Sequence, residues 1–330
     1  MIWNDAEYNY HHKKMPEYLK QAMLETGLSG NIRVEKVIKG TEELSLYRCI
    51  CQDEGILLQG FYYEDFVKIC STPKEDIDLY EVIKEICEEW ADNYRFMTDN
   101  RERLSKREIT EYLFPVLMDT KISGTLMDEI PHIERCGFPV GFHLWIPDGE
   151  DGARDILVSN QMQKQWGLET ETLLEIAVHN PHFLNQCTVF SINDLMREMN
   201  QQADDEDWGG IFLLADEETD IKQYFVRGEM FPGAASILNK EFAEELYRKM
   251  GEDFLVVFGA EGEIQIHEKD SDVEDLQIER EMQNARFGLS KDWVSDEVFR
   301  YTKEHGLELA CCIDEMEREV PKPVKPALRR

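Results

Sequence analysis

Apolar residues change their spacing repeatedly within the first hundred positions of the chain. Over residues 16–26 they recur every three or four positions, with Pro16 suited to a first helical turn and Gly27 to a helix end, which predicts one short amphipathic helix. Apolar runs bounded by Gly or by acidic pairs follow. They predict an antiparallel meander of strands at Ile32–Lys39, Leu44–Cys51 and Gly55–Gln59.

The clearest helical period lies in residues 76–97. One face has the apolar series Tyr80, Ile83, Cys87, Trp90 and Tyr94, and the other face is charged, with Glu81, Lys84, Glu85, Glu88 and Asp92. The pattern predicts a helix over Asp76–Met97. Because two heptads are too few for a coiled coil, we expect this helix to pack on the strands that precede it.

Strand-like and helical segments interleave irregularly in the second part of the chain. The predicted strands are Gly141–Ile146, Arg154–Val158, Ile211–Leu214, Gln223–Val226, Phe254–Phe258 and Glu263–His267. The strongest predicted helices are Glu171–Val178, Asn239–Met250 and Val273–Ala285. Since no regular strand-helix-strand period is present, the pattern predicts an α+β fold rather than a doubly wound parallel sheet.

Composition changes divide the chain into three predicted parts. The polar, charge-mixed segment Thr98–Arg107 separates an N-terminal α+β domain, residues 1–105, from a C-terminal α+β domain, residues 106–315. Residues 316–330 are rich in proline and basic residues, which predicts a disordered tail. The length of 330 residues also fits about two domains.

Charge excludes one class of function. The chain has 68 acidic residues against 36 basic ones, a net charge of −32, so it repels phosphate backbones and we expect no direct nucleic-acid binding. No signal-peptide pattern or long apolar run is present, which predicts a soluble, cytoplasmic protein without membrane contact. The eight scattered cysteines form no CxxC pair, so neither a disulfide framework nor a zinc knuckle is expected.

Residues 159–180 have the outline of a helix-turn-helix, with a break at Gly167. A recognition helix needs cations and hydrogen-bond donors toward DNA, whereas the second helix here offers Glu169, Glu171 and Glu175 without Lys or Arg. We therefore expect two helices that pack on a shared core.

A small group of polar and aromatic residues forms the candidate pocket: His132, Asn160, Trp166, His179 and His182. Imidazoles near neutral pH can bind metals or transfer protons. However, Pro181 interrupts the segment between the last two histidines, so their rings need not converge. The sequence thus predicts no metal ligand set and no cofactor, and the common nucleotide-binding and hydrolase motifs are absent.

Several ordered segments resemble a family of uncharacterised bacterial proteins, a domain of unknown function found mostly in anaerobic Gram-positive bacteria. The resemblance extends nearly end to end and rests on Phe61–Phe66, Pro131-His132, Ile156–Val158 with Asn160, Trp166-Gly167, the series Leu173, Ala177 and Asn180, Gly233–Ala235 and Val294–Tyr301. It implies a single family fold and supplies no reaction.

The chain departs from the family pattern at one place. Relatives commonly have Leu-Pro-Ser-Ser-x-His-Glu where this chain has Val257–Glu263, and only the final Glu remains. If that Ser and His act chemically in relatives, the resemblance implies an inactive member; if they shape a turn, nothing is lost.

These observations favour a protein-binding or regulatory module whose acidic surface selects its partner. One alternative is an enzyme, such as a metal-dependent hydrolase, with the histidine-lined pocket described above. A third hypothesis is an acidic mimic of nucleic acid, which would require carboxylates in phosphate-like rows. The sequence leaves the partner and the oligomeric state open.

Overall fold

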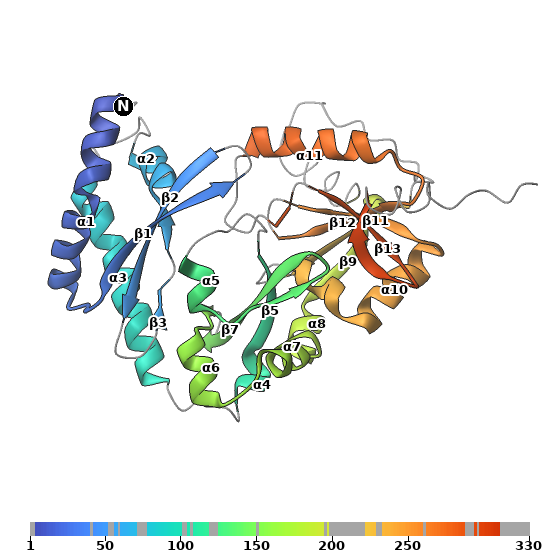
Figure 1. Ribbon diagram of the computed structural model, residues 1–330, viewed down its shortest axis with the longest axis horizontal. Helices are drawn as coiled ribbons and strands as arrows, with labels where there is room; N and C mark the ends of the chain where they lie inside the picture. The colour runs from blue at the N-terminus through green and yellow to red at the C-terminus, as the bar shows by residue number, and fades with distance from the viewer. Residues whose placement is uncertain are drawn as a thin grey trace, which may run out of the picture. The chain divides into compact units, whose positions relative to one another are not determined.

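In the computed structural model, helices and antiparallel sheets are mixed in each of two units, which confirms the predicted α+β fold class (Figure 1). The first unit comprises Met1–Glu134 and Pro139–Leu184, and the second comprises Arg135–Phe138 and Asn185–Arg330. The structure describes residues 4–39, 42–51, 56–58, 60–70, 78–100, 104–105, 108–118, 125–149, 152–194, 197, 222–228, 233–259, 262–287, 294–295 and 297–310.

The first sheet confirms the predicted N-terminal meander. Strands β1 (Asn31–Lys39), β2 (Glu42–Cys51) and β3 (Ile56–Leu57) pair antiparallel in that order, and β4 (Phe61–Tyr62) also pairs with β2. Almost every described residue of β2 is buried, because both faces of this strand are covered.

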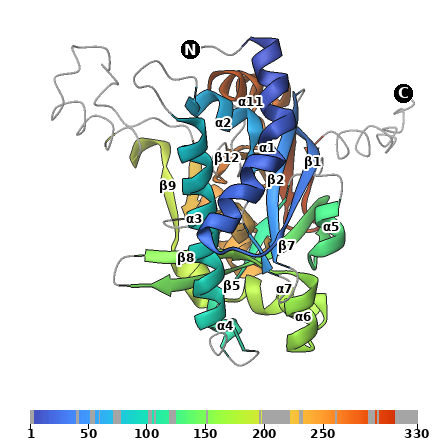
Figure 2. The same cartoon turned by 90° about the vertical axis from the view of Figure 1, so that its left-hand side faces the viewer.

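Three helices accompany this sheet: α1 (Asp5–Thr26), α2 (Tyr63–Cys70) and α3 (Leu79–Asp99). Helices α1 and α3 lie side by side (Figure 2), and the Cys87 thiol of α3 contacts the Leu19 carbonyl of α1 at 3.9 Å. Helix α3 buries Ile83, Cys87 and Trp90, so the predicted apolar face packs as expected.

Helix α1 begins well before the predicted start at Pro16. Asn4 caps the helix: its side chain accepts hydrogen bonds from the backbone N–H groups of Ala6 and Glu7, and the Glu7 carboxylate accepts from the Asn4 N–H. This capping box sets the start. Pro16 therefore lies inside the helix.

The second sheet of the first unit has the order β5–β7–β6, and β8 pairs with the C-terminal half of β7, from His143 to Asp148. Its strands are β5 (Leu113–Leu117), β6 (Ile133–Arg135), β7 (Phe138–Asp148) and β8 (Gly152–Leu157). The helices around it are α4 (Ile109–Tyr112), α5 (Thr125–Glu129), α6 (Asn160–Trp166), α7 (Thr170–Val178) and α8 (Pro181–Asn185). Helices α6 and α7 are the predicted pair that packs on a core.

The division into units differs from the boundary predicted near residue 105. Leu57 of β3 shares an apolar cluster with Met118 and with Leu126 and Ile130 at α5, so residues after 105 build one core with the N-terminal sheet. The predicted tail, residues 316–330, and the predicted strand Ile211–Leu214 lie outside the described residues.

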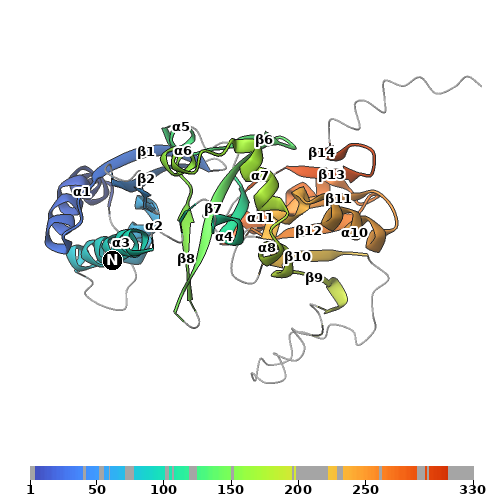
Figure 3. The same ribbon diagram turned by 90° about the horizontal axis from the view of Figure 1, so that it is seen from below.

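The second unit contains a sheet in the order β14–β13–β11–β12–β10–β9 (Figure 3). Its elements are β9 (Cys187–Ser191), β10 (Tyr224–Gly228), the 3₁₀ helix η1 (Gly233–Leu238), α10 (Lys240–Met250), β11 (Phe254–Phe258), β12 (Ile264–Glu268), α11 (Val273–Phe287), β13 (Val298–Thr302) and β14 (Gly306–Leu309). All five residues of β11 are buried. The side of β11 with Leu255 packs with Leu276 of α11, and Phe254 on its other side stacks on Tyr301 of β13.

Candidate functional site

A polar network centred on the buried Ser45 joins α1, the β1–β2 hairpin and α2. Ser45 of β2 has no exposed surface, and its Oγ lies 3.0 Å from His12 Nε2 and accepts a hydrogen bond from Lys36 Nζ at 3.0 Å. The Ser45 N–H donates to Glu64 at 2.9 Å, and the Tyr8 hydroxyl donates to the same carboxylate at 2.8 Å. These five residues form the Ser45 network.

The local sequence places each member of the Ser45 network. Lys36 lies directly opposite Ser45 in the register of the hairpin, so their side chains share one face of the sheet. Tyr8 and His12 are four residues apart and therefore share one face of α1. Glu64 lies in the first turn of α2, where a carboxylate is favoured by the helix dipole.

Two tyrosine hydroxyls bind backbone carbonyls of α1 beside this network. Pro16 has no N–H, so the His12 carbonyl four residues earlier lacks its usual helical donor. The Tyr47 hydroxyl donates to that carbonyl at 3.0 Å, and the Tyr63 hydroxyl donates to the Tyr8 carbonyl at 2.9 Å. Strand β2 thus supplies the hydrogen bond that the proline removes from α1.

The network keeps its members in defined protonation states. Burial, followed by the nearby Lys36 ammonium, lowers the pKa of His12, although Glu64 opposes the shift. Burial raises the pKa of Tyr47 to about 12, and burial together with the hydrogen bond to Glu64 also raises the pKa of Tyr8. Near pH 7 the imidazole is therefore neutral and both phenols keep their protons.

The chemistry of the Ser45 network is that of a hydrogen-bond junction. Since the Lys36 ammonium can only donate, the Ser45 hydroxyl proton can point to the neutral His12 Nε2. A serine between a base and a cation has the composition of an activated nucleophile. However, the Ser45 side chain is fully buried, so this arrangement fastens α1 and α2 to the hairpin.

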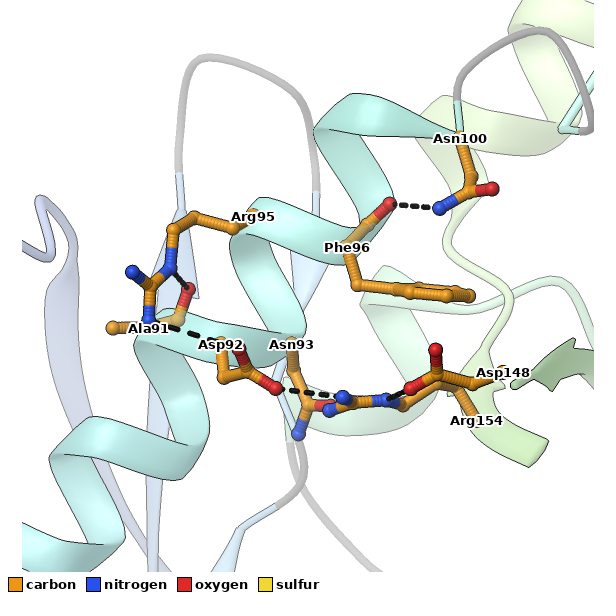
Figure 4. Close-up of polar contacts among 8 residues, drawn as sticks. All are labelled: Ala91, Asp92, Asn93, Arg95, Phe96, Asn100, Asp148 and Arg154. Carbon is orange, nitrogen blue, oxygen red and sulfur yellow. Dashed lines mark hydrogen bonds and ion pairs between the residues drawn. The ribbon is translucent and has the colours of Figure 1, made fainter. Parts of the chain in front are cut away.

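Arg154 of β8 forms a second polar cluster, with α3 and the end of β7 (Figure 4). Its Nε donates to Asp148 at 2.6 Å, and its two Nη atoms donate to Asn93 at 2.7 Å and to Asp92 at 2.6 Å. The guanidinium carbon lies 5.3 Å from the centroid of the Phe96 ring. The planar Arg fork thus binds two carboxylates and an amide at once, which fixes α3 against the second sheet.

Four exposed carboxylates form a row along the solvent face of α3, at spacings of four, three and four residues. A fifth exposed carboxylate lies beside this row. This α3 acidic face consists of Glu81, Glu85, Glu88, Glu89 and Asp92. Cations partly neutralise it: Lys84 lies 4.0 Å from Glu88, and Asp92 binds Arg154. Among the residues that the structure describes, Glu81, Glu85 and Glu89 have no ion-pair partner within 4.0 Å.

The predicted pocket residues His132 and Asn160 both bind carbonyls near the end of α5. His132 Nδ1 lies 3.2 Å from the Ile130 carbonyl, and the Asn160 side-chain amide donates to the Asp128 carbonyl at 2.8 Å. The structure thus brings these two residues to one short segment, where they satisfy helix-end carbonyls.

The other three predicted residues bind elsewhere. The Trp166 indole N–H donates to the Leu104 carbonyl at 2.6 Å, and the ring is buried. His179 is exposed at the end of α7, with its Nδ1 2.9 Å from the Glu175 carbonyl of the same helix. His182 is exposed in α8. The hypothesis of a catalytic pocket lined by these residues stays a prediction.

Within the described ranges, no group of three or more His, Cys, Asp or Glu residues is placed so that it could hold a metal ion. Likewise, no described helix is both long enough and apolar enough to cross a bilayer. Sequence reasoning missed the Ser45 network because its members come from four separate elements. One local signal was present: Ser45 is a polar residue between Leu44 and Leu46 in a mostly apolar predicted strand, Leu44–Cys51.

The Glu that remains from the family pattern has a structural partner. Glu263 binds the Arg227 guanidinium at 2.9 Å, and its carbonyl accepts a hydrogen bond from the Gly259 N–H at 2.7 Å. Arg227 in turn lies 5.7 Å from the Phe190 ring centroid. Glu263 therefore closes the connection from β11 to β12 and ties it to β10.

Comparison with curated proteins and with solved structures gives no match. A family model does match, over residues 8–303, and that range includes the Ser45 network, the Arg154 cluster and the α3 acidic face. The match covers most of the chain and agrees with the resemblance found in the sequence. The chain therefore belongs to the family of unknown function DUF5688.

Proposed function

We propose that this protein binds another protein, and that the α3 acidic face recognises a basic segment of that partner. The observation that supports the proposal is the row of exposed carboxylates on a helix whose opposite face is buried. Eleven residues separate its ends, a distance of about 17 Å along the axis. A basic helix or a short extended segment rich in Lys and Arg matches this length and charge.

The electrostatics favour such a partner at long range and at contact. A net charge of −32 attracts cationic proteins and raises their association rate. At contact, Glu81, Glu85 and Glu89 can each accept a hydrogen bond from an incoming ammonium or guanidinium group. A charge-assisted hydrogen bond is shorter and stronger than a neutral one.

An exposed apolar side chain lies near the N-terminal end of the same face. Leu24 of α1 is 81% exposed, and its neighbour Glu25 accepts a hydrogen bond from the Tyr80 hydroxyl of α3 at 2.9 Å. Interfaces typically combine a few apolar contacts with a polar rim. We therefore expect the partner segment to contain an apolar residue beside its basic ones.

A binding measurement with matched variants tests the proposal. The probe is a fluorescein-labelled peptide that repeats Lys-Lys-Leu-Lys, and anisotropy gives its Kd at low and moderate salt. The test variant is E81Q/E85Q/E88Q. The control is E241Q/E244Q/E245Q on α10, which removes the same charge from an exposed helix face and includes a similar pair, Lys240–Glu244 at 3.9 Å.

We expect the α3 variant to weaken binding about 10-fold, because the lost carboxylates contact the probe, and the control to change it less than about 2-fold. Added salt should weaken the wild-type complex. Equal losses in both variants would show that the peptide responds to net charge alone and would contradict a site on α3. A peptide with Glu in place of Lys should not bind.

A further inference from the structure

Strand β2, in the middle of the first sheet, contains a buried arginine. Only 7% of Arg48 is exposed, and in the part of the chain that the structure describes no residue forms a hydrogen bond or an ion pair with its guanidinium group. Its Nε is sealed from solvent. A charge taken out of water needs an opposite charge and hydrogen-bond partners. Arg48 therefore needs an acceptor that these residues do not supply.

A second cation lies beside Arg48. Arg33 of β1 is directly opposite it in the register of the hairpin, so the two side chains share one face of the sheet. Like charges at opposed positions destabilise a strand pair. Arg33 binds Glu129 of α5, and among the described residues this is the one ion pair that the two arginines form. One carboxylate thus serves two guanidinium groups.

The electrostatics around Arg48 agree with this shortage of negative charge. Burial lowers the pKa of Arg48, and Arg33 adds to the shift, while Glu35, Tyr62 and Glu129 oppose it. The guanidinium stays charged at pH 7, because the ordinary pKa of arginine is far above neutral. Neighbouring carboxylates therefore attract the cation from a distance but leave its hydrogen bonds unmade.

We propose that Arg48 and Arg33 bind the carboxylate of a small monocarboxylic acid with an apolar body. A guanidinium group only donates hydrogen bonds, so the ligand must supply acceptors. The planar fork of arginine matches the two oxygens of a carboxylate in parallel hydrogen bonds. Water can also accept a hydrogen bond, but it neutralises neither cation.

The neighbours of the two arginines select the class of acid. Glu35 and Glu129 repel a second negative charge, which disfavours a dianion such as doubly ionised phosphate. Leu46 and Ile50 flank Arg48 on the same face of β2, since alternate residues of a strand share a face. Leu46 is buried, and Ile50 packs against an apolar cluster. A single charge on a short apolar chain matches these surroundings.

This inference goes beyond the proposed binding at α3 and is independent of it. The α3 acidic face attracts cations, the arginine pair attracts anions, and the two share no residue. Failure of either experiment therefore leaves the other proposal untouched.

Two measurements on the full chain test the inference. Thermal unfolding in sodium chloride, sodium butyrate or sodium phosphate at equal ionic strength compares the wild type with R48M and R95M. R95M is the control, because it removes the same charge from an exposed position on α3. Saturation-transfer NMR then gives the Kd of butyrate for the wild type and for R48K, a variant that keeps the buried charge and lacks the planar fork.

We expect butyrate to raise the Tm of the wild type and of R95M by at least about 3 °C over chloride, and that of R48M by less than about 1 °C. In chloride, R48M should be at least as stable as the wild type, because it removes a buried charge without a partner. The Kd of butyrate should be at least about 10-fold higher for R48K.

Three results would overturn the inference. The first is a wild type that butyrate does not stabilise, and the second is an equal rise of Tm in R48M, which would place the effect elsewhere. The third is a larger rise with phosphate than with butyrate, since the site would then prefer a different class of anion.

Discussion

The two units place a histidine in contrasting surroundings, half-buried in the first and buried in the second. In the first unit, His12 lies in the Ser45 network, with its Nε2 3.0 Å from the Ser45 hydroxyl. In the second, His267 of β12 is 9% exposed and lies opposite Leu255, and among the described residues its Nε2 has no hydrogen-bond partner. One unit therefore uses polar contacts to fix an arrangement, while the other tolerates an imidazole within an apolar layer.

This contrast extends to how the elements are joined. Tyrosine hydroxyls and a buried serine connect α1 to the hairpin in the first unit. In the second unit, aromatic rings surround β11: Phe258 lies 5.0 Å from Phe138 and 5.4 Å from Phe299, between ring centroids. We infer that apolar burial stabilises the second unit and that directed hydrogen bonds specify the geometry of the first.

The largest expected effect comes from creating a cavity in the apolar core around β11. Phe258→Ala removes a fully buried ring and should lower the free energy of unfolding of the second unit by about 3 to 5 kcal/mol. Chemical denaturation followed by hydrogen exchange, peptide by peptide, measures the loss in each unit. Faster exchange confined to β1–β3 would contradict the assignment of this core to the second unit.

The second-largest expected effect is a loss of folding stability in acid that originates at His267. Burial lowers the pKa of His267 from its ordinary 6.5 to about 4, so the unfolded chain binds a proton at a higher pH than the folded one does. The stability contributed by the neutral ring is complete above pH 6.5 and is lost as the pH falls to about 4, a change of about 3 kcal/mol.

His267→Leu should flatten this dependence between pH 6.5 and 4, because it removes the group that must be protonated. His305→Gln is the control, since His305 is exposed on the same unit. Denaturation midpoints at several pH values measure both. If the leucine variant kept the acid sensitivity of the wild type, His267 would not be its source.

A smaller effect tests the bond between Tyr47 and the carbonyl left without a donor by Pro16. Tyr47→Phe should cost about 1 to 2 kcal/mol in the wild type, because the partly buried His12 carbonyl loses its partner. In a Pro16→Ala background a backbone N–H replaces it, so the same substitution should cost about 1 kcal/mol less.

Tyr63→Phe is the matched control for this cycle. Its hydroxyl binds the Tyr8 carbonyl, whose own helical donor is the His12 N–H, which Pro16 does not affect. The cost of Tyr63→Phe should therefore be equal in both backgrounds. Equal costs for Tyr47→Phe in the two backgrounds would contradict the claim that the Tyr47 hydroxyl compensates for the N–H that Pro16 lacks.

The smallest effect concerns the Arg154 cluster. Arg154→Lys keeps the charge and removes the planar fork, so it should cost about 1 kcal/mol. Arg95→Lys is the control, because Arg95 approaches the same Asp92 at 3.7 Å from an exposed position and should cost less than about 0.3 kcal/mol. Thermal unfolding measures the loss of stability in each variant. Equal losses would show that Arg154 contributes no more to stability than an ordinary surface ion pair does.

The elements that were predicted well are those with a strong local pattern. The continuous apolar run Phe254–Phe258 is β11 to the residue, and the three-and-four spacing found α3 with its ends displaced by two or three positions. Short elements such as β5 and α2 were missed, since a few residues contain too little periodicity to identify a strand or a helix.

The features that were missed depend on contacts between distant positions. Pro16 indicates a helix start when only its neighbours are considered, and it becomes an internal residue because Tyr47 compensates for its missing N–H. Similarly, the electrostatic influence of Lys36 and Glu64 on His12 requires the pairing of the hairpin and the placement of α2. The candidate histidines were visible as residue types, but their partners, such as the Ile130 carbonyl, were not.

Pro16 also has a consequence for the order in which the chain folds. Residues after Pro16 can form helical turns from local interactions alone. The preceding half of α1 lacks a helical donor at His12 until Tyr47 arrives from a strand 35 residues away. We therefore expect nascent helix in the isolated N-terminal segment to concentrate in residues 16–26, and the earlier turns to become ordered only as the hairpin docks, late along the folding pathway.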